Sequence, residues 1–148
     1  MKSSSAKRAR STSPKHDRAS EENVQKFLVM YLDISYKDWI YQMNYLSGAK
    51  LPIGLASKAK TLGHRKSIPD VMIFEPRGEY HGLFIELKRE CTRIRKSDDS
   101  GFANEHIERQ AAMLDRLTKK GYKAVFGCGI DEAMEIVNEY AKLQPAYK

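Results

Sequence analysis

The hydrophobic positions along the chain follow two spacings, and each spacing predicts a type of element. Apolar residues recur at helical intervals in residues 20–33, in residues 104–120 and from Asp131 onward. Alternating or continuous apolar runs occupy residues 39–45, 68–74, 82–88 and 122–126, which predicts four strands. Residues 51–62 are small, basic and interrupted by Gly and Pro, so they fit either a short helix or a loop. This order predicts an α/β fold with a mixed sheet and helices on both sides.

Two of the predicted strands bring charged residues together. Residues 68–74 form a continuous apolar run around Asp70, which is typical of a strand buried on both faces. Residues 82–88 alternate instead, with apolar side chains on one face and Glu86 and Lys88 on the other. Pro and Gly residues between the two runs predict a hairpin or close neighbours. We therefore expect Asp70 to lie beside Glu86 and Lys88.

This cluster of two carboxylates and one amine has a possible chemistry. Neighbouring carboxylates repel unless a cation lies between them, and oxygen ligands suit Mg²⁺, which also takes phosphate oxygens. A lysine alongside can position water and offset charge on a phosphate, so the pattern fits hydrolysis of a phosphodiester. The alternative is a salt-bridged trio at the edge of a sheet, because alternating charges on a strand also serve solubility.

Chain length, the cysteines and the apolar runs limit the classes to which the protein can belong. With 148 residues the chain is long enough for one core, which we place in residues 20–148. Two distant cysteines suggest neither a zinc site nor a disulfide framework, and no apolar run suggests a membrane span or a signal segment. An intracellular, cytoplasmic protein that is not secreted is therefore expected.

The net charge of +7 is concentrated in two segments. Residues 1–19 carry a net charge of +5, and residues 50–96 carry a further +6. Such clustering favours a polyanionic partner. Residues 1–19 contain no core-forming residues, so we expect a disordered basic tail that either contacts nucleic acid or only aids solubility.

The motif around the cluster resembles that of a known family. Pro69-Asp70 followed by Glu86-Leu87-Lys88 resembles the PD-(D/E)XK nuclease motif. With residues 63–68 and 80–85, Gln110 and residues 120–122, the chain looks like the VRR-NUC (virus-type replication-repair nuclease) domain over about residues 20–140. One departure is Ser67, where the family usually has a glycine.

The resemblance implies a fold and an activity. The fold would be the restriction-endonuclease-like PD-(D/E)XK fold, and the activity a Mg²⁺- or Mn²⁺-dependent DNA endonuclease without an organic cofactor. The family implies replication, repair or recombination, with branched DNA such as a Holliday junction as the substrate class. A homodimer would supply two active sites, and a phage or bacterial origin fits the compact chain. The alternatives are a noncatalytic nucleic-acid-binding module and a ribonuclease.

The resemblance also assigns roles to individual residues. Asp70 and Glu86 would bind the metal together with the backbone carbonyl of Leu87, and Lys88 would position the attacking water. An additional carboxylate would come from the first helix, where Glu21 lies closer to the apolar face than Glu22; both also fit surface carboxylates that favour the helix dipole.

Gln110 lies on the inward stripe of its helix, either as a hydrogen-bonded core amide or, as the resemblance implies, as a residue that orients Lys88 or water.

Basic residues on both sides of the motif are candidates for binding nucleic acid. Arg65 is the preferred phosphate contact, because its planar guanidinium suits phosphate oxygens and it lies close to Asp70 in sequence; the alternative is an exposed basic turn. Residues 89–96 suggest a mobile basic loop that either clamps the substrate or only connects two elements. His64 is read as a surface residue. The full set comprises Lys58, Lys60, Arg65, Lys66, Arg89, Arg93, Arg95 and Lys96.

Overall fold

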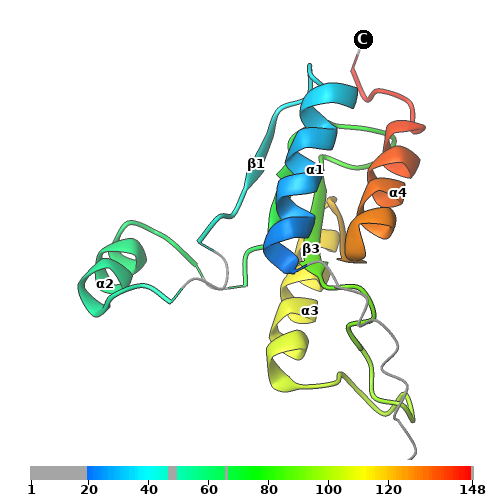
Figure 1. Ribbon diagram of the computed structural model, residues 1–148. Helices are drawn as coiled ribbons and strands as arrows, with labels where there is room; N and C mark the ends of the chain where they lie inside the picture. The colour runs from blue at the N-terminus through cyan, green and yellow to red at the C-terminus, as the bar shows by residue number, and fades with distance from the viewer. Residues whose placement is uncertain (1–19, 47–49, 66, 148) are drawn as a thin grey trace, which may run out of the picture.

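A computed structural model describes residues 20–46, 50–65 and 67–147 of the chain. Within these ranges the chain forms an α/β domain (Figure 1). Its elements in chain order are α1 (Glu21–Ser35), β1 (Tyr41–Met43), α2 (Ile53–Thr61), β2 (Val71–Ile73), β3 (Leu83–Lys88), α3 (Glu105–Thr118), β4 (Lys123–Cys128) and α4 (Gly129–Ala141). Residues 1–19, for which a disordered tail was expected, and Lys66 lie outside the described residues.

The strands form one mixed sheet in the order β1-β2-β3-β4. β1 and β2 are antiparallel, β2 and β3 are antiparallel, and β3 and β4 are parallel. The prediction that residues 68–74 and 82–88 form neighbouring strands is confirmed, with Val71 opposite Ile85 and Ile73 opposite Leu83. β3 is therefore a central strand that is hydrogen-bonded on both sides, which makes it the most constrained place in the sheet for a functional side chain.

Two helices, α1 and α4, cover one face of the sheet. α1 begins after Ser20, whose hydroxyl caps the helix by accepting a hydrogen bond from the amide of Asn23. Its apolar residues recur every four positions and pack with those of α4 into the main core. The buried residues of these two helices are Val24, Leu28, Leu32, Ala133, Val137 and Tyr140.

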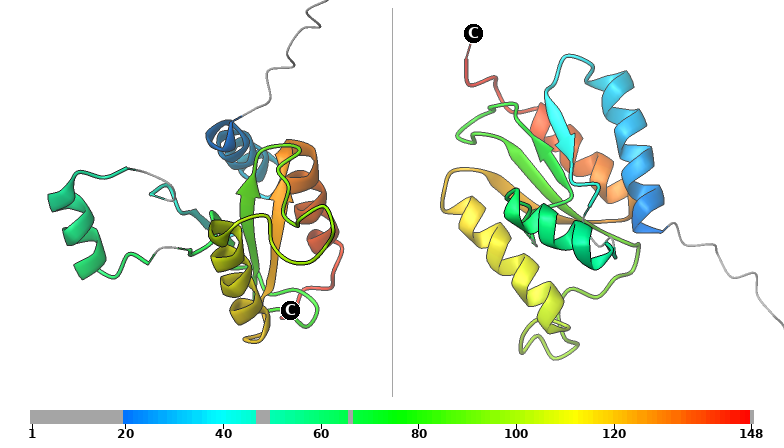
Figure 2. Two further views of the ribbon diagram at one scale, coloured as in Figure 1. Left: turned by 90° about the horizontal axis from the view of Figure 1, so that it is seen from below. Right: turned by 90° about the vertical axis from the view of Figure 1, so that its left-hand side faces the viewer.

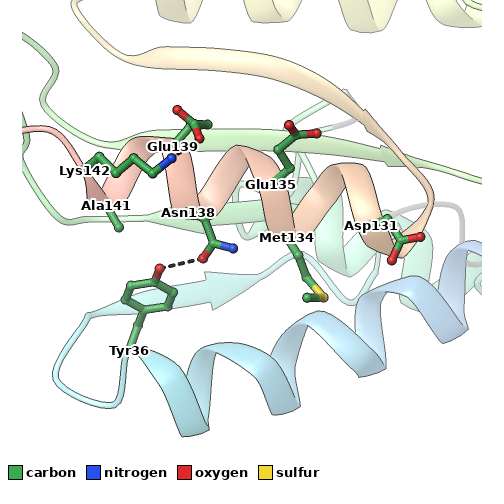
Figure 3. Close-up of a pocket in the computed structure, with 8 residues that line it drawn as sticks. All are labelled: Tyr36, Asp131, Met134, Glu135, Asn138, Glu139, Ala141 and Lys142. Atoms are coloured by element: carbon green, nitrogen blue, oxygen red, sulfur yellow. Dashed lines mark hydrogen bonds and ion pairs between the residues drawn. The ribbon is translucent and has the colours of Figure 1, made fainter.

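The end of α1 is fastened to α4 by a polar contact. The hydroxyl of Tyr36 donates a hydrogen bond to Oδ1 of Asn138 at 2.7 Å (Figure 3). The two residues border a surface pocket of about 620 Å³. None of the described residues predicted for the active site lines this pocket, so we treat it as part of the α1–α4 packing.

The helix α3 covers the opposite face, so the predicted arrangement with helices on both sides is confirmed (Figure 2). Ile107 and Leu114 of α3 are buried. On the same side, the ring of Phe84 in β3 lies 4.8 Å from the ring of Tyr122, measured between centroids. Because α3 closes this face, side chains of β3 that alternate toward it are shielded from water.

Burial in the two central strands differs from the sequence prediction. β2 was expected to be buried on both faces, but Met72 is half-buried and Phe74, just beyond the strand, is 45% exposed. β3 was expected to alternate between core and polar face, yet all six of its residues are buried. The reason is position: β2 has only the short β1 outside it, whereas β3 lies between two neighbours and beneath helices on both faces.

The segment that fitted either a helix or a loop contains the helix α2. This helix has no buried residue, and it lies apart from the layered core (Figures 1 and 2). The side chain of Ile53 at its start is 91% exposed. No helix in the described ranges has both the length and the apolar character needed to cross a membrane.

Candidate active site

The two central strands place Asp70 and Glu86 next to each other. The pairing of Val71 with Ile85 makes Asp70 and Glu86 the next opposed pair along the strands. The carboxylate of Asp70 is fixed there, because its Oδ2 accepts a hydrogen bond from the backbone amide of Leu87 at 2.9 Å. Directly opposed residues have Cβ atoms about 5 Å apart. The carboxyl groups therefore lie on neighbouring strands at the same end of the sheet, close enough to interact.

Lys88 and Gln110 both bind the Glu86 carboxylate. The Nζ of Lys88 lies 3.0 Å from Oε1 of Glu86, and Nε2 of Gln110 donates to the same oxygen. All three side chains are at least 94% buried. A buried lysine and a buried carboxylate are stable only when they are paired, so each holds the other in place.

One atom of this cluster has an unmet hydrogen-bonding requirement. Oε1 of Gln110 is buried and has no hydrogen-bond partner among the described residues. The hydrogen bonds shown for the Glu86 carboxylate both fall on its Oε1, which leaves Oε2 for another partner. A buried orphan acceptor is destabilising by about 1–3 kcal/mol. A hydrated divalent cation fits this donor set, since Glu86 and Asp70 offer oxygen ligands and the Gln110 oxygen can accept from water.

The electrostatics of the site favour an additional cation. Burial, followed by the nearby Asp70 carboxylate, raises the pKa of Glu86 to about 7, although Lys88 acts in the opposite direction. The charge of Glu21 contributes in the same direction as that of Asp70. One ammonium group is therefore insufficient to balance the carboxylates that gather here. A divalent cation between them would lower the free energy of the ionised form.

Glu21 lies near the cluster, but within the described part of the chain it does not complete a converging set of metal ligands. It is the first residue of α1, is exposed, and lines the same cleft as Asp70 and Glu86. Its neighbour Glu22 also lines the cleft but is paired with Lys26 at 2.7 Å. Across the described ranges, no three Asp, Glu, His or Cys side chains converge closely enough to form a metal site by themselves. The metal ligands named from the sequence, Asp70, Glu86, Leu87 and Glu21, thus remain a prediction.

The cluster lies in a large cleft that is partly lined by basic side chains. The cleft has a volume of about 1990 Å³ and is bordered by α1, by α2 with the residues after it, and by α3. The predicted nucleic-acid-binding residues Lys60 and Arg65 line it, as do all five predicted catalytic residues. A cleft with carboxylates at one place and basic side chains around it fits a polyanion whose phosphate approaches a bound cation.

Some predicted binding residues lie elsewhere. Lys58 is on α2 but does not line the cleft, and neither do Arg89, Arg93, Arg95 and Lys96. The loop that carries the latter residues is closed by backbone hydrogen bonds from Lys96 to Gly101 and from Ala103 to Ile94. Arg95 also stacks over the ring of Phe102 at 5.0 Å. The loop has defined internal contacts and does not line the cleft. A clamp on the substrate and a simple connection between two elements both remain predictions for it.

The sequence analysis missed several residues of the cleft, and two of them are on α3. His106 and Arg109 on α3 line the cleft together with Gln110. A signal was available for His106, because a residue four positions before Gln110 in a helix lies on the same face. Arg109 directly precedes Gln110 and so does not share its face. Both residues lie about twenty positions after the motif, outside the basic segments that flank it in sequence.

Comparisons with known proteins agree with the fold and the motif. A scan against protein-family models gives no match, and a search of curated proteins gives none. A search of solved structures finds similarity to a chain described as a VRR_NUC domain protein. The sequence identity is 26%, the match covers 86% of this chain and 92% of that chain, and the TM-score is 0.62. This similarity supports the resemblance seen in the sequence and the predicted α/β fold.

Proposed function

We propose that the chain is a divalent-metal-dependent endonuclease that hydrolyses phosphodiester bonds in DNA, because its motif resembles that of the VRR-NUC nuclease family and its structure is similar to that of a VRR_NUC domain protein. One observation carries the proposal. Asp70, Glu86 and Lys88 gather at the end of two central strands, in contact with Gln110 of α3, within a cleft that is partly lined by basic side chains. Buried carboxylates in a cleft suited to a polyanion have no role in simple phosphate binding, but they do have one in holding a cation.

In this proposal Asp70 and Glu86 hold Mg²⁺ or Mn²⁺, with the Leu87 carbonyl and Glu21 completing the set. The cation supplies Lewis-acid stabilisation of charge on the phosphate and favours ionisation of water. Both carboxylates are pre-positioned, Asp70 by the Leu87 amide and Glu86 by Lys88 and Gln110. This pre-positioning reduces the reorganisation that the site needs before reaction.

The chain's own residues then serve the chemical step. The Nζ of Lys88 is held at the Glu86 carboxylate, from which it can orient an attacking water and stabilise negative charge on the phosphate. The orphan oxygen of Gln110 can accept a hydrogen bond from water at the site. The water oxygen loses a proton and forms a new bond to phosphorus, the bond from phosphorus to one ester oxygen breaks, and that departing oxygen takes up a proton. The reaction yields one end with a phosphate and one with a hydroxyl.

The substrate class rests on what the resemblance to the VRR-NUC family implies. We propose branched or junction DNA in replication, repair or recombination, in the cytoplasm of a bacterial or phage-infected cell.

Cutting both strands of a junction requires two active sites, so the functional form would be a homodimer. α1 exposes Phe27, Met30 and Ile34 on successive turns, an apolar surface that a second copy would cover. Light scattering tests for the homodimer by comparing the molecular mass of wild type with that of Ile34→Glu. Ile53→Glu on α2 is the matched control.

The decisive experiment for the activity compares substrates and variants with Mg²⁺, Mn²⁺ and EDTA. The panel contains duplex, flap, four-way junction, single-stranded DNA and RNA. Lys88→Ala should reduce cleavage by at least about 100-fold while binding persists, because it removes a group that acts on the reacting atoms. Lys119→Ala, an exposed lysine paired with Asp115 on α3, is the matched control and should cut normally.

Each other outcome has a defined meaning. Binding without cleavage in either metal would leave a noncatalytic nucleic-acid-binding module. Cleavage of RNA alone would indicate a ribonuclease on the same fold. Cleavage that continues unchanged in Lys88→Ala or in EDTA would overturn the assigned mechanism.

A further inference from the structure

The cleft has three walls with different charges, and the difference suggests the path of the substrate. We infer that the nucleic-acid strand crosses the active site between α3 and α2, with Arg109 binding a phosphate on one side of the scissile bond and Arg65 binding one on the other. We call the residues that bind along this path the phosphate track: His106, Arg109, Lys60 and Arg65. The inference rests on the proposed nuclease function and adds the direction in which the strand lies.

The α3 wall carries a basic side chain that lines the same cleft as the cluster. Gln110 contacts Glu86 directly, and Arg109 precedes it in the same helix and lines the cleft. The buried residues Ile107 and Leu114 fix which face of α3 is turned to the sheet. The Arg109 side chain remains 62% exposed, with Glu105 3.6 Å away as an exposed partner. Such an exposed ion pair contributes little, so a phosphate can replace Glu105 at small cost.

The α2 wall offers a second basic site at a separate place. Lys60 is in the last turn of α2, and Arg65 lies shortly after the helix. Nη1 of Arg65 donates to the carbonyl of Lys60 at 3.3 Å, which ties the guanidinium to the end of α2. The hydrogen bonds shown for Arg65 use only Nη1, and its side chain is exposed. The remaining guanidinium donors can bind a phosphate in the planar geometry that arginine prefers.

The third wall disfavours a polyanion. The first turn of α1 places Glu21 and Glu22 in the cleft. Lys26 is already paired with Glu22, so it offsets only one of these charges. A phosphate backbone that ran along α1 would approach the uncompensated charge of Glu21 as well as the carboxylates of the site. The path between α3 and α2 avoids this repulsion, while it still brings one phosphate to Asp70 and Glu86.

The test maps each arginine to one side of the cut. Binding is measured with Ca²⁺ in place of Mg²⁺, using the best-bound DNA of the panel and versions shortened stepwise from either side of the cleavage position. Where no cleavage position exists, the shortening runs from either end of a bound single strand. Arg109→Ala and Arg65→Ala should each weaken binding about 3- to 10-fold and reduce the salt slope by about 1.

The two losses should respond to opposite truncations. The penalty of Arg109→Ala should vanish when nucleotides are removed on one side, and that of Arg65→Ala only when they are removed on the other. Arg116→Ala is the matched control: it lies seven residues after Arg109 on the same helix, is exposed and does not line the cleft. Arg109→Lys, which keeps the charge, should restore most of the salt slope.

Several results would overturn the track. The binding losses of Arg109→Ala and Arg65→Ala could both vanish on the same truncation. Arg116→Ala could weaken binding as much as Arg109→Ala does, or Arg109→Ala or Arg65→Ala could bind DNA like wild type. A change in thermal melting would identify a folding defect, and Arg109→Lys and His106→Gln then provide the binding measurement. Because binding is measured without cleavage, the phosphate track can be confirmed even if the proposed hydrolysis fails. Hydrolysis can likewise be confirmed even if the phosphate track is wrong.

Discussion

Ser67 is held in a backbone conformation that a glycine would adopt without strain. Its φ angle is +72°, in the left-handed region. The family that this chain resembles usually has a glycine here, and the structure gives the physical reason for that preference. The residue precedes Ile68, Pro69 and Asp70, so the strained turn sets the entry to β2 and the position of the first carboxylate. Serine tolerates this conformation, but its Cβ makes it unfavourable by about 1 kcal/mol.

We predict that Ser67→Gly stabilises the protein. The gain from relieved strain is partly offset by the greater freedom of glycine in the unfolded chain, so the expected increase in the free energy of unfolding is about 0.5 kcal/mol. Chemical denaturation measures it. Ser67→Ala is the control, because it removes the hydroxyl but keeps the Cβ, and it should not be more stable than wild type. Equal stabilisation by both substitutions would contradict the strain argument.

Glu86 makes stability depend on pH. Burial and the Asp70 charge raise its pKa from an ordinary value of 4.5 to about 7 in the folded protein. The folded state therefore binds this proton more tightly than the unfolded state does. The resulting stabilisation is complete below about pH 4.5 and is lost as the pH rises through about 7.

We predict that, in EDTA, the melting temperature falls between pH 5 and pH 8, and that Glu86→Gln flattens this fall. Mg²⁺ should raise the melting temperature more at pH 8 than at pH 5, since it binds the ionised carboxylate. Thermal melts at constant ionic strength measure both effects. A wild-type profile with the same slope as that of Glu86→Gln would show that another group is responsible.

At the level of residues, the sequence predicted the pairing of Asp70 with Glu86 because strand alternation and one register are enough to place them. It did not predict that Lys88 would be buried, since an alternating strand with charged residues usually faces water. That burial depends on α3, whose contact with β3 is made through Gln110. Arg109 was missed for the same reason, because whether it lines the cleft depends on how α3 is turned toward the sheet. His106 could have been inferred from its spacing to Gln110.

At the level of elements, Arg77 joins three parts of the fold. It lies between β2 and β3, and its Nη1 donates to the carbonyls of Ala141 and Leu143 at 2.8 and 3.0 Å. Its guanidinium also lies 5.0 Å from the ring centroid of Trp39. One side chain thus satisfies carbonyls at the end of α4, where a positive charge is favourable, and covers an aromatic ring before β1.

We predict that Arg77→Ala lowers the free energy of unfolding by about 2 kcal/mol, because it removes the side-chain donor from two partly buried carbonyls and also removes a cation–π contact. Denaturant titration measures the loss. Arg93→Ala, an exposed arginine in the loop before α3, is the control and should stay within about 0.5 kcal/mol of wild type. A loss of similar size in both variants would show that net charge is the cause.

Arg77 also shows which kind of contact cannot be predicted from sequence patterns. Apart from α2, the helices and strands were predictable from periodicity, and their observed ends differ from the predicted ones by three residues at most. Arg77 carries no periodic signal, and its partners lie more than sixty residues away. Contacts of this kind follow from the packing of α4 on the sheet and can be seen only once the fold is known.

At the level of the whole molecule, the charge is divided between two parts of the chain with different roles. The net charge is +7, of which residues 1–19 carry +5, so residues 20–148 have a net charge of only +2. Those residues also contain the carboxylates of the candidate site. Attraction to a polyanion at long range should therefore depend strongly on the first 19 residues, whereas placement of a phosphate at Glu86 depends on the cleft.

We predict that deletion of residues 1–19 weakens DNA binding and reduces the slope of log affinity against log salt by up to about 5, because six basic side chains no longer release counterions. The cleavage rate at saturating DNA should remain near that of wild type, since the deletion leaves Asp70, Glu86 and Lys88 unchanged. Replacement of the six basic residues by Gln in the full chain separates charge from length and should have the same effect. Unchanged affinity and salt slope in both variants would assign the segment to solubility alone, and a lost cleavage rate at saturation would place it at the active site instead.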